Sequence, residues 1–328
     1  MPLKTHSNAA SLPASPLGPL FALLGFGIYS THDVIVKYLG ETFSVFQIMF
    51  FSGMFSFPLI MGMLMRDRTP GTLRAVHPWW SMLRMVTVVA GTASAFYAFT
   101  VLPLAQTYTM LFAAPILITI LSIPLLGERV GLHRGLAVAL GLMGVIVVLR
   151  PGAEPVSLGH LAGVFAAFGI ALSSVIMRKI GRDERSAVLM LYPMLANLVI
   201  MGLALPFVYQ PMELAELALT GVIAAMAFVA ALLIIAAYRL AEAAVVAPMQ
   251  YSQILWATVY GVVLFSETPD AWTLVGAALI IVSGLYIVFR ETRRNVSSNR
   301  PVSRARTRME SVTSPNDTDA HTPIKSNK

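Results

Sequence analysis

Two stretches decide the fold of this chain: LLGERVGLHRGLAVALGLMGVIVVLR at Leu125–Arg150 and LFSETPDAWTLVGAALIIVSGLYIVFR at Leu264–Arg290. Each begins at the end of an apolar run, passes a glutamate in a tight connection, and continues into a second apolar run that ends in arginine. Glu128 and Glu267 are 139 residues apart, and the closing arginines are 140 apart, so one inserted residue aligns the two copies. The pattern indicates that the chain contains two copies of one unit.

The composition assigns both copies to a membrane. Hydrophobic residues make up 57% of the 328 residues, charged residues make up 12%, and the mean hydropathy is +0.74. Soluble domains carry about 25% charged residues. A chain this apolar must bury its surface in a lipid bilayer, which is its first partner.

Ten apolar runs are long enough to cross a bilayer core, which needs about 20 residues as a helix. The sequence therefore predicts an all-α integral membrane protein of ten transmembrane helices. Because each repeat holds five helices, an odd number, the second repeat enters the membrane upside down, as in many secondary transporters. The predicted units are an N-terminal tail at 1–16, repeats at 17–150 and 151–290, and a polar tail at 291–328 that is too poor in apolar residues to fold alone. The runs are 17–39, 43–65, 80–101, 104–126, 132–149, 157–178, 186–208, 216–238, 244–265 and 271–290.

The basic residues give the predicted orientation, because cytoplasmic loops are rich in Lys and Arg. Twenty of the 23 lysines and arginines fall on the side that holds both termini, and two fall on the other side. We expect a multi-pass protein of a bacterial inner membrane with both termini in the cytoplasm. The net charge of +7 is then a topology signal, and it predicts no nucleic-acid partner.

The paired motifs LLGE at Leu125–Glu128 and LFSE at Leu264–Glu267, each followed by a glycine-rich span, resemble the drug/metabolite transporter superfamily, in particular its EamA-type members. The resemblance covers about 17–290 and implies a transporter with two inverted five-helix repeats. The segments STHDVIVKYLG and APMQYSQILWA are similar to the group that includes riboflavin importers. Many EamA-type proteins carry an arginine early in the second span, but Ser44–Gly53 has none, which weakens the case for an anionic substrate.

The first span carries His32, Asp33 and Lys37 in an otherwise apolar run. A charged side chain at the centre of a membrane helix costs about 2.5–3.5 kcal/mol on insertion scales, so Asp33 must face the bundle or a wet cavity. One interpretation is a structural pair between Asp33 and Lys37, which share a helix face at i, i+4. The other is a cavity residue that binds substrate, with Asp33 or His32 coupling transport to protons. Tyr29 lies on the same stripe as Asp33.

The ninth span holds the densest polar and aromatic cluster, APMQYSQILWATVYG at Ala247–Gly261. Amides read the hydrogen-bonding edge of a ligand, and aromatic rings stack on flat molecules. We expect Gln250, Gln253 and Trp256, with Tyr251 beside them, to face a cavity between the two halves; the alternative is that they join helices. Further candidate binding residues are Tyr97, Tyr108, Tyr192 and Asn197.

No phosphate-binding Gly-Lys motif, HExxH motif or His/Cys metal cluster occurs in the sequence, so we expect no enzyme, no cofactor and no metal. The sequence predicts a secondary transporter of a small organic molecule, with uptake of riboflavin or another planar metabolite as the best single hypothesis. An exporter of amino acids, nucleobases or drugs that exchanges protons is the alternative. A membrane-embedded enzyme or a scaffold is a more distant one.

Overall fold

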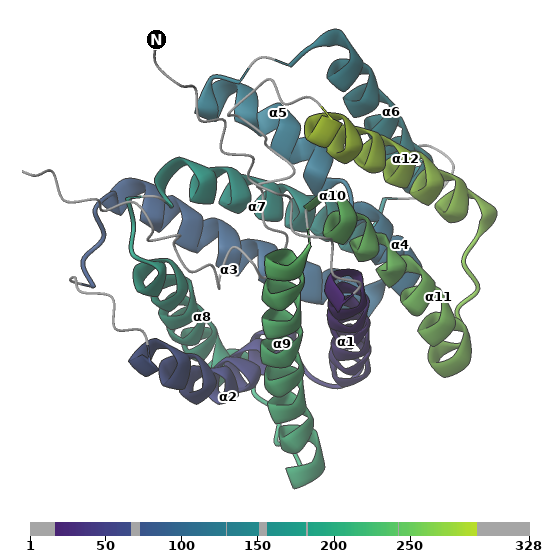
Figure 1. The fold of residues 1–328 in the computed structure, drawn as a ribbon. Coiled ribbons are helices and arrows are strands. Elements are labelled where there is room, and N and C mark those ends of the chain that lie inside the picture. The colour runs from purple at the N-terminus through teal and green to yellow at the C-terminus, as the bar shows by residue number, and fades with distance from the viewer. Residues whose placement is uncertain are drawn as a thin grey trace, which may run out of the picture.

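The computed structural model describes residues 17–66, 73–128, 130–150, 156–181, 183–241 and 243–293, and these residues form helices and no strand. Figure 1 shows the helices gathered in one bundle. Their bounds are α1 Leu17–Gly40, α2 Val45–Arg66, α3 Pro78–Val101, α4 Leu104–Leu111, α5 Ala114–Leu126, α6 Leu132–Leu149, α7 Leu158–Ile180, α8 Ser186–Val208, α9 Leu214–Leu240, α10 Ala243–Val246, the 3₁₀ helix η1 Ala247–Tyr251, α11 Ser252–Phe265 and α12 Ala271–Arg293.

Ten membrane spans result within the described residues, as the sequence predicts, and their ends agree with the predicted runs to within three residues. Helices α4 and α5 together make the fourth span, and α10, η1 and α11 make the ninth. Eight helical stretches have the length and hydropathy to cross a membrane, and a shorter apolar helix covers Gly135–Leu149. The predicted repeat boundary at 151–155, the N-terminal tail, and residues 294–328 of the C-terminal tail lie outside the described residues.

The fourth and ninth spans are interrupted at equivalent places. The fourth breaks at Phe112 and Ala113, and the ninth changes from η1 to α11 at Tyr251 and Ser252, which is 139 residues later. Proline explains why the helices break here. It has no backbone N–H to donate, and its ring clashes with the preceding turn. Pro115 stands in the first turn of α5, and Pro248 lies in η1.

Both interrupted spans end with the same cap. Gly127 and Ser266, again 139 residues apart, adopt left-handed φ values of 68° and 55°. In each case the next residue, a glutamate, donates its backbone N–H to a carbonyl six residues earlier, at N–O distances of 3.3 Å in the first copy and 2.9 Å in the second. This bond satisfies a carbonyl that the helix end would leave open. The second copy keeps the cap geometry with a serine, which carries a side chain into a conformation that favours glycine.

The two repeats interlock extensively. The most extensive helix contacts join a helix of one repeat to a helix of the other: α1 with α9, α3 with α7, α6 with α12, and α2 with α8 (Figure 1). The contact of α1 with α9 and that of α3 with α7 are equivalent, because each joins the first span of one repeat to the third span of the other, as expected for two inverted copies. Each repeat therefore buries much of its apolar surface against the other.

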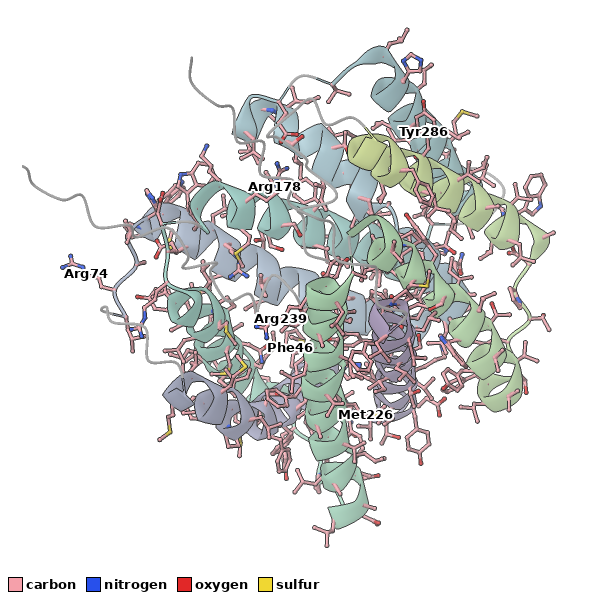
Figure 2. All side chains as sticks on the ribbon, in the orientation of Figure 1. Phe46, Arg74, Arg178, Met226, Arg239 and Tyr286 are labelled. Carbon is pink, nitrogen blue, oxygen red and sulfur yellow. The ribbon has the colours of Figure 1, made fainter. Side chains whose placement is uncertain are left out.

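Two of the ion pairs that cross between the repeats occupy equivalent positions. Glu128 accepts from Arg178 at 2.6 Å, and Glu267 pairs with Lys37 at 2.8 Å (Arg178 is labelled in Figure 2). Glu128 follows the fourth span of the chain and Glu267 follows the ninth, which is the fourth span of the second repeat. In each pair the cation comes from the last turns of the first span of the other repeat. Since successive spans run in opposite directions, the two pairs lie at opposite ends of the bundle. Each glutamate thus joins the two repeats at one end of the bundle.

Close helix contact at Gly169 gives a first testable consequence. A Cβ there would lie 2.9 Å from the Cα of Gly91 and 3.0 Å from the carbonyl oxygen of Thr87, both backbone atoms of α3 that cannot rotate away. We expect Gly169→Ala to separate α3 from α7 and to lower stability by about 1–3 kcal/mol, as overpacking does. Gly62→Ala is the matched control, because a Cβ at Gly62 meets nothing within 4 Å. Thermal unfolding of both variants in detergent measures the difference; equal midpoints would contradict the packing argument.

Candidate substrate site

A cavity of about 230 Å³ lies among five spans, with α1, α2 and α3 from the first repeat and α8 and α9 from the second. Its wall is mainly apolar and rich in methionine, with polar groups at a few points. Lys, Arg, Asp and Glu do not occur among its lining residues. These are Tyr29, His32, Met49, Ser52, Gly53, Ser56, Ile60, Met63, Val88, Val89, Thr92, Phe96, Met190, Pro193, Met194, Asn197, Ile223, Ala224, Ala227, Phe228 and Ala231.

Three of the predicted binding residues line this cavity. Tyr29 is buried, and its hydroxyl donates to the carbonyl of Ala227 on α9 at 3.3 Å. His32 is 4% exposed, and its ring meets those of Tyr29 and Phe96 edge to face. Asn197 donates its Nδ2 to the carbonyl of Met49 at 3.3 Å. The cavity therefore joins polar groups of both repeats in one space.

Asn197 also carries an open acceptor. Its Oδ1 is buried and has no hydrogen-bond partner among the described residues. A buried polar atom without a partner costs about 1–3 kcal/mol, and such atoms in native structures often serve function. A ligand that brings an N–H or O–H donor would meet this oxygen once the amide turns it toward the cavity.

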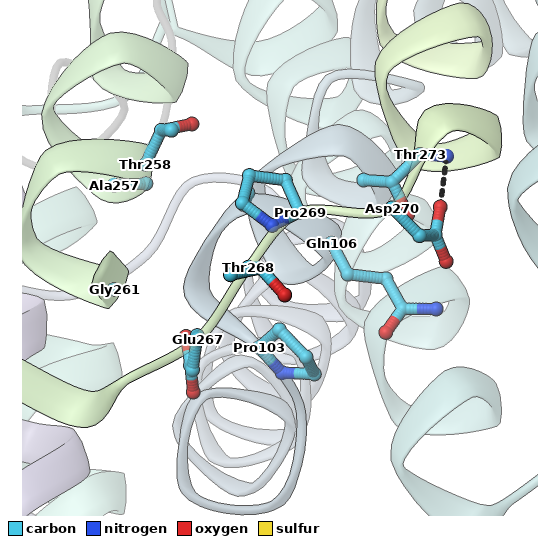
Figure 3. Close-up of a pocket in the computed structure, with 11 residues that line it drawn as sticks. Pro103, Gln106, Ala257, Thr258, Gly261, Glu267, Thr268, Pro269, Asp270 and Thr273 are labelled. Atoms are coloured by element: carbon cyan, nitrogen blue, oxygen red, sulfur yellow. Dashed lines mark hydrogen bonds between the residues drawn. The ribbon is translucent and has the colours of Figure 1, made fainter.

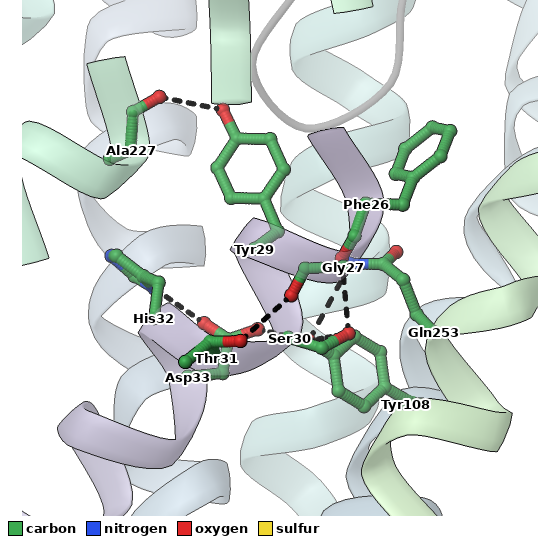
Figure 4. A network of polar contacts seen from close by, with 10 residues as sticks. All are labelled: Phe26, Gly27, Tyr29, Ser30, Thr31, His32, Asp33, Tyr108, Ala227 and Gln253. Carbon is green, nitrogen blue, oxygen red and sulfur yellow. Dashed lines mark hydrogen bonds and ion pairs between the residues drawn. The ribbon is translucent and has the colours of Figure 1, made fainter. Parts of the chain in front are cut away.

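Asp33 lies behind the cavity, at the centre of a polar network (Figure 4). Its side chain is fully buried; one oxygen is 2.8 Å from Nδ1 of His32, and the other accepts a short hydrogen bond from the hydroxyl of Tyr108 on α4. Nε2 of Gln253 donates to the same hydroxyl at 3.5 Å. The network thus runs from the cavity wall at His32 inward to α11.

The predicted pair between Asp33 and Lys37 is wrong. Nζ of Lys37 reaches away from Asp33 to Glu267, and it also donates to the carbonyl of Leu102 at 2.7 Å. Its side chain is long enough to reach the end of the bundle, where it gains a carboxylate and a free carbonyl together. Sharing a helix face is therefore not enough to make the pair.

The polar cluster of the ninth span does not line the cavity, contrary to expectation. Gln253 is buried against Tyr108, and Tyr251 packs edge to face on Phe112, at the break of the fourth span. Trp256 is 41% exposed and stacks on Tyr260, and its ring contacts Gly27 of α1. Gln250 is half-buried in η1. This face does lie opposite the first span, as predicted, but it packs there rather than enclosing a ligand.

Two other predicted residues lie outside the cavity as well. Tyr97 is 37% exposed on α3, and the hydroxyl of Tyr192 donates to the carbonyl of Leu73 in the connection before α3. The sequence reasoning missed Ser52 and Ser56 of α2 and the methionines of α8. The i, i+4 spacing of two serines in an apolar span was a signal for the first pair, because small polar groups avoid lipid.

A second, smaller hollow of about 50 Å³ lies at the end of the bundle that holds Glu267 (Figure 3). Beside it, Asp270 accepts from the backbone N–H of Thr273 at 2.6 Å and pairs with Arg150. Partial burial raises the pKa of Asp270, but the hydrogen bonds from Thr273 and the charge of Arg150 outweigh it, so the pKa lies below the usual value. The carboxylate therefore stays ionised at neutral pH and caps α12, and this hollow is part of a helix cap.

Comparison with known proteins gives consistent results. The model of the EamA-like transporter family matches twice, at residues 16–150 and 157–290. A solved crystal structure, 20% identical, has the same fold with a TM-score of 0.58 over 84% of this chain and 99% of that one.

Curated relatives cover nearly the whole chain. An S-adenosylmethionine uptake transporter of Rickettsia bellii is 26% identical over 89% of this chain and 97% of its own length. A riboflavin transporter of Rhizobium johnstonii is 26% identical over 88% and 97%, and a pseudopaline exporter of Pseudomonas aeruginosa is 25% identical over 81% and 94%. With two family matches that together span most of its length, this chain belongs to the EamA-like transporter family and is a multi-pass membrane transporter of small molecules.

Proposed function

We propose that this protein carries a small heterocyclic metabolite of neutral or positive charge through the cavity between its repeats, and that S-adenosylmethionine is the first candidate. The lining of the cavity supports the charge class, because the described residues that form it include no lysine or arginine to attract an anion. Four relatives with 26–27% identity are named S-adenosylmethionine uptake transporters, and the matches cover 83–90% of this chain.

The chemistry of the wall fits this ligand. S-adenosylmethionine joins a positive sulfonium to a flat adenine with an exocyclic amine. Aromatic faces attract cations, and methionine side chains adapt to irregular ligands. The wall offers the aromatic rings of Phe96, Phe228 and Tyr29 to attract the sulfonium, and four methionines that adapt to the shape of the ligand. The open Oδ1 of Asn197 is the acceptor that an adenine amine needs.

Riboflavin is the second candidate. It is a neutral planar ring with a donor on its edge, so the same acceptor and aromatic groups suit it. The relative in Rhizobium johnstonii with that name is 26% identical to this chain, the same identity as the S-adenosylmethionine transporter of Rickettsia bellii. We further infer that the end of the bundle holding Arg178 faces the cytoplasm, which the distribution of basic residues supports.

The test is uptake of labelled S-adenosylmethionine into proteoliposomes. We expect saturable uptake, competed by excess unlabelled compound and only weakly by S-adenosylhomocysteine, which lacks the sulfonium charge. Riboflavin uptake without S-adenosylmethionine uptake would replace the first candidate by the second, and uptake of neither would refute both.

The same assay tests the site. Asn197→Leu removes the acceptor, and we expect KM to rise about two- to tenfold, as the loss of a hydrogen bond worth about 0.5–1.5 kcal/mol implies. Tyr97→Phe removes a hydroxyl outside the cavity and serves as the control with unchanged KM. If Asn197→Leu transports like wild type, the cavity does not bind the heterocycle through this residue.

A further inference from the structure

We infer that His32 and Asp33, with Tyr108 behind them, form the site that binds and releases a coupling proton, and that this proton competes with a cationic substrate. The inference rests on the proposed function for the substrate's charge only; the proton site itself stands on the geometry of α1 and α4.

The carboxylate of Asp33 is placed where a lone charge is costly. It is fully buried in a membrane span, where neutralisation by a partner or by a proton is strongly favoured. The basic group nearest along the helix, Lys37, is committed to Glu267 at the end of the bundle. His32, 2.8 Å away, is the partner that can bring or remove a proton.

The surrounding elements hold few other ionisable groups that face this site. Helix α1 packs against α2, α3, α9, α10, η1 and α11. Arg84 of α3 donates to the carbonyl of Leu189 near the opposite end, and Tyr260 of α11 bonds Thr31. Among the described residues, the ionisable side chains that contact the pair are Tyr29, whose ring lies edge to face with that of His32, and Tyr108, whose hydroxyl donates to Asp33. Of these and the pair itself, a histidine is the side chain whose ordinary titration falls between pH 5 and 8.

His32 connects the buried carboxylate to the transport cavity. Its ring lines the cavity, whereas Asp33 does not. Because Nδ1 faces Asp33, a proton is exchanged with the cavity through Nε2. With the proton bound, the pair is an imidazolium opposite a carboxylate and has no net charge. When Nε2 gives the proton to water in the cavity, a neutral imidazole remains, Nδ1–H still donates to Asp33, and the pair carries one negative charge.

This charge change links the proton to the substrate. The deprotonated pair attracts a cation into a cavity whose walls carry no other charged side chain, and the protonated pair does not. Proton and cation therefore exclude each other, and by reciprocity each weakens the affinity for the other by the same factor. Tyr108 holds the carboxylate in place and stabilises its charge.

The first experiment needs no substrate. Histidine labelled with ¹⁵N reports ring protonation of the full-length protein in lipid nanodiscs, and His32→Gln identifies the signal among the six histidines. We expect that signal to move between its neutral and protonated positions from pH 8 to 5. In Asp33→Asn the response of that signal to pH should differ from wild type, because the carboxylate beside Nδ1 is gone.

Two further variants keep the experiment decisive. Tyr108→Phe leaves the carboxylate present but removes its donor, so the response of the signal to pH should again differ from wild type. This variant answers the question if Asp33→Asn does not fold. His133→Gln, at an exposed position of α6, should leave the signal unchanged. A His32 signal that does not move between pH 8 and 5, or that has the same midpoint in all variants, would overturn the proton site.

The second experiment tests the competition. Binding of S-adenosylmethionine to wild type should release protons below the midpoint and weaken up to tenfold for each pH unit of acidification, and His32→Gln should lose both effects. Binding without proton release would refute the coupling while the substrate proposal stands. If the ligand does not bind at all, the substrate proposal fails, and the ¹⁵N titration alone decides the proton site.

Discussion

Lys37→Glu is expected to abolish transport and to reduce the folded yield sharply. Nζ of Lys37 is nine-tenths buried, and it bonds Glu267 and the carbonyl of Leu102. The reversal places two carboxylates together at the junction of the repeats and leaves that carbonyl without its donor. Breaking a buried ion pair by changing one partner typically costs about 3–5 kcal/mol. Folded yield by size-exclusion chromatography and uptake in proteoliposomes measure the two losses.

Exchanging both charges shows whether the effect comes from loss of the ion pair or from the new charge at position 37. Lys37→Glu combined with Glu267→Lys restores an ion pair at the same place, so we expect yield to recover for the most part. Asp270→Asn is the control at the same end of the bundle, since its exposed pair with Arg150 contributes at most about 1 kcal/mol, and asparagine still caps α12. A single Lys37→Glu variant that folds and transports normally would show that the pair does not hold this end together.

The second large effect concerns access to each end of the bundle. The pairs Lys37–Glu267 and Arg178–Glu128 fasten opposite ends, so neutralising one pair is expected to loosen its own end only. The chain has no cysteine, so single cysteines can report this directly. Thr107→Cys and Ser122→Cys place buried thiols on the fourth span, near the Lys37 end and the Arg178 end respectively.

We expect a reciprocal pattern of labelling by a water-soluble maleimide. Arg178→Met with Glu128→Gln should speed labelling at position 122 about tenfold, the change in an equilibrium that about 1.4 kcal/mol produces, and should leave position 107 unchanged. Lys37→Met with Glu267→Gln should do the reverse. Equal acceleration at both positions would mean general unfolding, and no acceleration would mean that the pairs do not control access.

The ten spans were predictable because the bilayer imposes a length on every apolar run, and the repeat was predictable because both copies kept a glutamate in the same cap. The partner of Lys37 was not predictable in this way. Spacing along one helix shows that Asp33 and Lys37 share a face, but the rotation of α1 against α4 and α11 decides which groups meet them. That rotation depends on packing contacts far apart in the sequence, such as Tyr108 with Asp33.

The cavity was hard to predict for a different reason. Its walls come from α2, α8 and α9, whose lipid-facing and cavity-facing sides are both apolar, so no periodic pattern separates them. Met190 and Met194 would be equally suited to lipid. In the ninth span the pattern was clear but led to the wrong surface: Trp256 and Gln253 share a polar stripe that packs against α1 and Tyr108. Polar groups in a membrane helix mark contact with protein, and a ligand is only one form of it.

The two equivalent ion pairs between the repeats also have a consequence for the chain during its synthesis. Lys37 and Glu128 leave the ribosome with the first five spans, whereas Glu267 and Arg178 are still to be synthesised. The first repeat therefore lies in the bilayer with Lys37 at one end and Glu128 at the other, each without its counterion. The second repeat supplies both counterions when it is inserted. Lys37 and Glu128 gain these counterions only when the second repeat is made, so two separately expressed halves should each be short-lived alone and rescue one another when made in the same cell.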